Sequence, residues 1–108
     1  VANDNWRYMP EDAPETRFAH VTAENAGESL FVRCERQTLR RLPQTQAVLF
    51  TIGIAVAPLV RISTANLRRV ADAITAISGG EHERRAAPFY ADVFDRYTLS
   101  RELEEKAA

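Results

Sequence analysis

An almost wholly apolar run, AVLFTIGIAVAPL at residues 47–59, constrains the fold of this chain more than any other feature. Its Val, Ile and Phe residues favour a β-strand, and the absence of alternating polar residues is typical of a central strand covered on both faces. Gly53 inside the run predicts a bulge or a close approach to the backbone, and Pro58 predicts the end of the pairing.

A second strand is predicted just before this run, over residues 30–37. Side chains alternate between two faces of a strand, so one set meets a core and the other faces away. The inward set is Leu30, Val32 and Cys34, and the outward set is Phe31, Arg33, Glu35 and Gln37. Residues 38–42 predict a helical turn that Pro43 stops. Because the connection between the two strands is short, we expect them to be antiparallel.

Two helices are predicted in the carboxy-terminal half of the chain. Ser63 or Thr64 caps the first helix, Gly79 and Gly80 end it, and Pro88 opens the second. The inward residues are Leu67, Val70, Ala71, Ile74 and Ile77 in the first helix, and Phe89, Val93, Phe94 and Tyr97 in the second. Residues 100–108, SRELEEKAA, are interpreted as a solvated, frayed tail, or as one or two further helical turns around Leu103.

The amino-terminal part carries weaker signals. Residues 3–9, NDNWRYM, predict a short strand with Trp6 and Tyr8 on one face, which Pro10 ends. Residues 10–18 are then interpreted as a loop, and residues 22–29, TAENAGES, as a turn.

Together these elements predict an α+β fold in a single domain, residues 1–108, with a small antiparallel sheet and two carboxy-terminal helices. A sheet of two or three strands is thin for a central strand that is apolar on both faces. Either the helices cover one face and a partner covers the other, or further strands precede Val1. Because the chain starts without a methionine, missing upstream sequence is allowed for.

Charge and cysteine content exclude several classes of function. The 14 Lys and Arg nearly balance the 15 Asp and Glu, so no overall field draws the protein to nucleic acid or to an anionic membrane. Cys34 is the only cysteine, which rules out an internal disulfide and indicates a reduced, cytoplasmic setting. No run has the roughly 18 apolar residues of a membrane helix, so we expect a soluble protein.

Residues 24–52, ENAGESLFVRCERQTLRRLPQTQAVLFTI, resemble the signature of the haem-dependent oxidative N-demethylase family, and Asn5-Trp6 resembles its upstream NW strand. The resemblance implies a PAS-like fold, a haem cofactor, and oxidative removal of a methyl group from an amine with dioxygen and electrons from partner reductase subunits. It also implies that the chain corresponds to the carboxy-terminal portion of a larger haem-binding domain. Where family members continue with polar residues, this sequence has Gly53-Ile54-Ala55.

Under this resemblance the candidate cofactor-binding residues are Arg36, Thr38, Arg40 and His20. Arg36 shares the inward face of its strand, and a buried guanidinium needs an anion such as a haem propionate, or else a structural Asp or Glu. Thr38 either caps the following turn or binds a ligand, and Arg40 lies at that turn. His20 is a candidate iron ligand, or a packed or exposed loop residue. The iron ligand itself stays unassigned.

Other residues are interpreted as structural. Arg33 is expected to be a surface or cross-strand charge, Cys34 a small buried hydrophobic residue, and His82 a solvent-facing loop residue. Three functions remain open: a haem-dependent oxygenase domain, a non-catalytic PAS-like module whose strand edge pairs with another copy or subunit, and a truncated inactive relative.

Overall fold

The computed structural model describes residues 1–5, 13–77, 80 and 86–108. The helices are α1 (Pro14–Arg17), α2 (Ala26–Ser29), α3 (Thr64–Ala76) and α5 (Ala91–Ala107), with 3-10 turns η1 (Leu59–Arg61) and η2 (Ala87–Phe89). In the described part of the chain, β1 (Phe31–Arg41) and β2 (Val48–Pro58) form one two-stranded antiparallel sheet. The predicted α+β fold with two carboxy-terminal helices is therefore confirmed.

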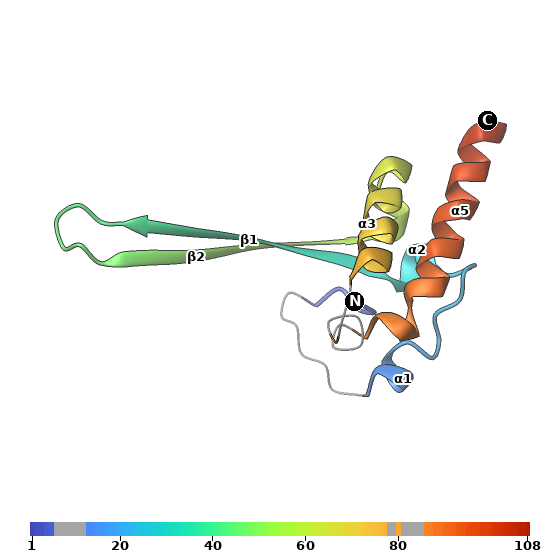
Figure 1. Cartoon of the computed structure of the whole chain (residues 1–108), viewed down its shortest axis with the longest axis horizontal. Coiled ribbons are helices and arrows are strands. Elements are labelled where there is room, and N and C mark those ends of the chain that lie inside the picture. Colours follow the sequence, from blue (N-terminus) through green and yellow to red (C-terminus); the bar gives the residue numbers. More distant parts are fainter. Residues whose placement is uncertain (6–12, 78–79, 81–85) are drawn as a thin grey trace.

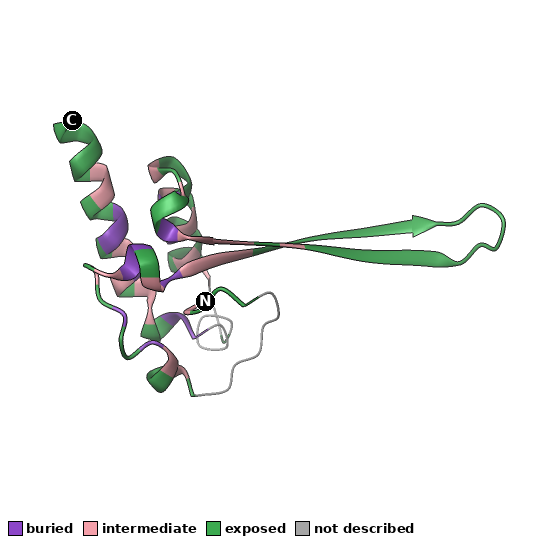
Figure 2. Cartoon of the chain, turned by 180° about the vertical axis from the view of Figure 1, so that it is seen from behind, coloured by how far each residue is buried: buried purple, intermediate pink, exposed green. Residues whose placement is uncertain are grey.

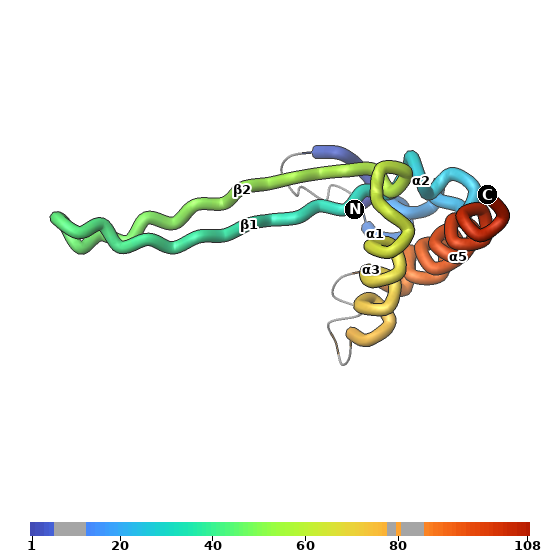
Figure 3. Tube along the Cα trace, turned by 90° about the horizontal axis from the view of Figure 1, so that it is seen from above, coloured from blue at the N-terminus to red at the C-terminus, as the bar shows by residue number. Residues whose placement is uncertain are grey.

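The molecule consists of a helical body and a long β-hairpin arm that projects from it (Figure 1). Its extents are 58 × 35 × 27 Å and its radius of gyration is 16.8 Å, whereas a compact domain of this length has about 13 Å. Helices α3 and α5 both lie at the base of the arm, and the hairpin loop is at the far end (Figure 3). The arm accounts for the elongated shape.

The two strands pair along their whole length, from Phe31 opposite Pro58 to Arg41 opposite Val48. The backbone amide of Leu42 donates to the Ala47 carbonyl at 2.8 Å and closes the loop. The predicted helical turn over residues 38–42 is wrong, because residues 38–41 continue β1. Residues 38–41 form their backbone hydrogen bonds with β2, so they need no helical turn to satisfy these groups. Pro43 lies in the loop beyond the paired strands.

Most of the arm is exposed on both faces, and only its base is partly buried (Figure 2). In β2, Val48 is 57% exposed, Phe50 51% and Ile52 49%. The prediction that residues 47–59 form a strand covered on both faces is therefore wrong for this chain. The helices cover only the base of the hairpin, and among the described residues no third strand lies beside it.

The core lies in the body, where α3 and α5 pack together and against the base of the arm. Leu59 and Leu67 are fully buried, with Phe94 and Tyr97 close by. Ser63 caps α3 by accepting a hydrogen bond from the Asn66 amide, as its sequence predicts. Helix α3 ends at Ala76, before the expected glycine stop; Gly79 lies outside the described residues.

The second predicted helix starts later and ends later than its sequence suggests. Pro88 lies in η2 and Phe89 is 39% exposed, so the inward stripe of α5 begins at Val93 and continues with Phe94 and Tyr97. The tail is not frayed, because α5 continues to Ala107. Its last turns carry Glu102, which is fixed by an ion pair to α3.

The amino-terminal segment differs from its prediction. Residues 3–5 are not in a strand, and residues 6–9 of the predicted strand lie outside the described residues. Val1 instead exchanges two backbone hydrogen bonds with Phe31, at 2.9 and 2.8 Å, along the outer edge of β1. The predicted turn over residues 22–29 contains the short helix α2.

Helix α2 approaches α5 closely at Gly27. A Cβ atom at this position would lie 2.7 Å from the hydroxyl oxygen of Tyr97. Tyr97 is 9% exposed, and its hydroxyl accepts a hydrogen bond from Arg101 at 3.0 Å. Arg101 also donates to the Ile62 carbonyl at 3.1 Å, so it links α5 to the connection between β2 and α3.

Arg68 joins α3 to α5 through a cluster of carboxylates. Its guanidinium donates to both oxygens of Glu102, at 2.8 and 2.9 Å, and to Asp95 at 3.0 Å. These hydrogen bonds raise the pKa of Arg68, and the bond from Arg68 lowers the pKa of Glu102 below its usual value. The paired, ionised form of Glu102 is therefore the form that fixes the two helices.

We predict that Gly27→Ala lowers the free energy of unfolding by about 1–3 kcal/mol, because the added methyl group collides with a tyrosine that is itself buried and hydrogen-bonded. Urea denaturation measures the loss. Gly53→Ala is the matched control, since the nearest atom to its added Cβ is 3.9 Å away; its effect should stay within about 0.5 kcal/mol. Equal losses from both variants would contradict the close packing at Gly27.

We predict that Glu102→Gln destabilises the protein at neutral pH and that its difference from the wild type shrinks as the pH falls. Folding lowers the pKa of Glu102, so its contribution is present above the unfolded value of 4.5 and is lost as the pH falls through the lower folded value. Urea denaturation between neutral pH and pH values well below 4.5 measures this. Exposed Glu104 on the same helix provides the control variant Glu104→Gln. A constant difference at all pH values would contradict the role of the ion pair.

Candidate functional site

The body contains a cavity of about 560 Å³ between the arm base and the helices, called here the body cavity. Its walls come from the amino-terminal segment, α1, β1, α3, the residues on either side of η2, and α5, so distant parts of the chain build it. The lining residues are Val1, Arg17, Phe18, Leu30, Phe31, Val32, Arg33, Val70, Ile74, Ile77, Ala86, Tyr90 and Phe94. This volume lies within the range of small-molecule and cofactor pockets in proteins.

The side chains that line the body cavity belong to apolar residues except for Arg17, Arg33 and Tyr90. Arg33 is partly buried, with 15% of its side chain exposed, and it pairs with Glu35. The Arg17 guanidinium lies 5.5 Å from the ring centre of Phe18, whose ring in turn lies 5.1 Å from that of Tyr90. An apolar space with two arginines at its wall suits an apolar ligand that carries anionic groups.

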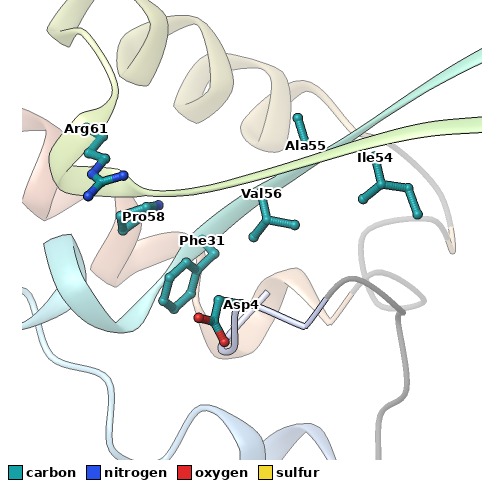
Figure 4. A pocket seen from close by; sticks show the side chains of 7 residues that line it. All are labelled: Asp4, Phe31, Ile54, Ala55, Val56, Pro58 and Arg61. Atoms are coloured by element: carbon teal, nitrogen blue, oxygen red, sulfur yellow. The ribbon is translucent and has the colours of Figure 1, made fainter.

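A second hollow, the arm-base cavity, has about 570 Å³ and is lined by Asp4, Phe31, Ile54, Ala55, Val56, Pro58 and Arg61. Phe31, Ile54 and Val56 lie on the same side of the hairpin as Asp4, and Ala55 points to the other side (Figure 4). The cavity is therefore mainly an apolar sheet face with one acidic and one basic residue near it.

The structure brings three of the four predicted cofactor-binding residues to one face of β1, but not to either cavity. Arg36, Thr38 and Arg40 are alternate residues of the strand, and all three are exposed. Arg36 lies opposite Gly53, and the Thr38 hydroxyl forms a hydrogen bond with the hydroxyl of Thr51 opposite. Thr38 therefore bonds across the hairpin and caps no turn.

The prediction that Arg36 points toward the core is wrong, because Arg36 is exposed. The alternation of the strand is correct, since Leu30 is buried and Val32 is partly buried on that side. The body, however, ends near Arg33, and Cys34 on the same side as Leu30 is already exposed. Within the described part of the chain, Arg36 and Arg40 form no ion pair.

His20 lies apart from the other three candidates, in the body after α1. It is exposed, its carbonyl accepts a hydrogen bond from the Asn25 side chain at 2.8 Å, and it is not in the lining of either cavity. His82 lies outside the described residues. Among the residues that the structure describes, no group of three His, Cys, Asp or Glu side chains could hold a metal ion.

The sequence alone did not point to Arg17, Arg33 and Tyr90 as cavity residues. The sequence predicts a surface or cross-strand charge for Arg33, yet Arg33 lies at the base of β1, where the body still covers the strand. Arg17 and Tyr90 reach the same cavity from a four-residue helix and from the residue before α5. The periodicity of the sequence cannot predict that these three residues line one cavity, because they lie in three separate segments that come together only in the folded chain.

The fold and the body cavity define a small α+β protein with an apolar, arginine-flanked pocket. The sequence model of the family "haem-dependent oxidative N-demethylase, alpha subunit-like" matches residues 2–93. The chain therefore belongs to this family, as the resemblance predicts. Neither a curated protein nor a solved structure shows a significant match to the chain. None of the helices in the described part of the chain has the length and apolar character that crossing a membrane requires.

Proposed function

We propose that this chain is the carboxy-terminal, cofactor-binding portion of a haem-dependent oxidoreductase that removes methyl groups from amines oxidatively. The family match over residues 2–93 carries the proposal, because the family is described by its haem dependence and by this reaction. The family description as an alpha subunit supports partner subunits that deliver electrons. The single cysteine is consistent with a reduced cytoplasmic setting.

The body cavity fits the chemistry of haem in two respects. Its apolar lining can cover the porphyrin faces and keep water away, and the Arg17 and Arg33 guanidinium groups can bind propionates by charge-assisted hydrogen bonds. Among the described lining residues, Tyr90 contributes a phenolic oxygen, a group that ligates haem iron in some proteins. Bound haem would supply the oxygen and redox chemistry, while these residues would hold it and exclude solvent.

The binding of cofactor by Arg36, Thr38, Arg40 and His20 stays a prediction. Arg36, Thr38 and Arg40 share one exposed face of the arm, and another part of the larger domain would have to cover that face to make a closed site. Two pairs of arginines are therefore alternative binding partners for the anionic edge of the cofactor. One pair is Arg17 and Arg33 at the body cavity, and the other is Arg36 and Arg40 on the arm.

A different observation supports a second function, that of a non-catalytic PAS-like interaction module. A truncated inactive relative is the remaining alternative. The arm exposes large apolar side chains along most of its length, as an interaction surface does. Such a module would be folded and would not bind haem saturably.

Haemin titration of the purified chain, followed by the Soret absorption, tests the proposal. We expect saturable binding, and we expect Arg33→Ala to raise the Kd about tenfold or more, because a propionate loses a charge-assisted hydrogen bond. Arg36→Ala is the matched control on the same strand, with an expected change of less than about twofold. Circular dichroism shows whether each variant is folded.

Two outcomes would contradict these assignments. A folded wild-type chain without a saturable Soret change would remove the haem proposal for this chain and favour the interaction module. A larger effect of Arg36→Ala than of Arg33→Ala would assign the cofactor to the arm instead of the body cavity.

A further inference from the structure

The outer edge of β2 lacks the features that usually protect an edge strand. The chain has no charged residue between Arg41 and Arg61, and β2 has no proline before Pro58. In the described residues β2 pairs only with β1, so its other edge presents unpaired backbone groups over eleven residues. Long, uncharged, exposed edges are templates for pairing with another strand.

The outer edge of β1 is different. β1 carries four arginines and one glutamate, Arg33, Arg36, Arg40, Arg41 and Glu35, and its base already bonds to Val1. A second β1 placed against it would bring like charges together, which destabilises strand pairing. Pairing through β2 avoids this conflict.

We propose that two copies of this chain associate by antiparallel pairing of β2 with β2, centred on Gly53. In this register Val48 of one copy lies opposite Pro58 of the other, and all eleven residues of the strand are paired. On one face Phe50 lies opposite Val56 and Ile52 opposite Ile54, which joins large apolar residues across the interface. On the other face Leu49 lies opposite Ala57, Thr51 opposite Ala55, and Gly53 opposite Gly53. No two large side chains meet on this face.

The same register completes the arm-base cavity. Val56 and Ile54 line this cavity on the face that Asp4 also borders (Figure 4). Because opposite residues of an antiparallel pair point to the same face, Phe50 of the second copy would stand beside Val56 and add an apolar side chain to the cavity wall. Phe50 is 51% exposed in the single chain. The pairing would cover part of this exposed side chain with Val56 of the other copy.

Charge supports a second copy as the partner. The arm, residues 31–58, has four arginines and one glutamate and carries +3, whereas the whole chain carries −1, so the rest of the chain carries −4. Antiparallel pairing lays the two arms side by side and brings the loop end of each arm, with Arg40 and Arg41, to the base of the other copy. At that end the positive charge of the arm meets the negatively charged body, and this contact favours the association.

Sedimentation velocity of the full chain and two lysine variants tests the pairing. We expect a dimer for the wild type, and for Phe50→Lys a dimer Kd raised about tenfold or more, because the charge would be buried against Val56. Leu39→Lys is the matched control: Leu39 lies directly opposite Phe50 on the same face, but on β1, one strand away from the interface. Its Kd should change less than about threefold. A monomeric wild type, or equal effects of the two lysines, would overturn the proposal.

Disulfide trapping tests the register without depending on the lysine variants. In a Cys34→Ser background, Gly53→Cys should form an intermolecular disulfide readily, because the two Cα atoms at position 53 would lie about 4.5–5.5 Å apart. The site has room for a side chain, since the nearest atom to a Cβ there is 3.9 Å away. Leu49→Cys is the control, because its copies would lie about 27 Å apart in this register. Equal cross-linking at both positions, or none at position 53, would overturn the proposed register. The outcome is independent of haem binding.

Discussion

The structure depends on a β-hairpin whose strands are longer than the body that supports them. Eleven residue pairs join β1 to β2, but the helices cover only the first few. An isolated two-stranded hairpin is marginal in water, so the arm depends on the body at its base and on whatever covers the rest. The packing of α2 on α5 at Gly27, the Arg101 contacts to the strand–helix connection and the Arg68–Glu102 ion pair all stabilise that base.

Much of the fold can be predicted from local sequence. The Ser63 cap, the apolar stripe of α3 and the antiparallel pairing of two neighbouring strands follow from short-range periodicity and turn length. Burial could not be predicted in the same way. The alternation of β1 correctly assigns Leu30 and Arg36 to one face, but it does not tell where along the strand the body ends. Arg36 lies beyond that point and is exposed.

The candidate site shows the same limit more strongly. Arg33 is assigned to a face by its strand, yet its partial burial beside Arg17 and Tyr90 depends on three segments meeting in space. No spacing in the sequence links these residues. The family membership, by contrast, is carried by continuous sequence, and the match over residues 2–93 agrees with the resemblance in residues 24–52. Family and element types were therefore predictable, whereas the cavity residues were not.

Two surfaces remain for function: an apolar cavity with arginines inside the body, and an uncharged strand edge along the arm. The arm should be open in a single chain and covered in an assembly. Amide hydrogen exchange on residues 34–54, measured over a range of protein concentrations, tests this most directly. We predict fast exchange relative to α3 and α5 at low concentration and strong protection of the β2 amides at high concentration. Arm protection equal to that of the helices at every concentration would contradict the account.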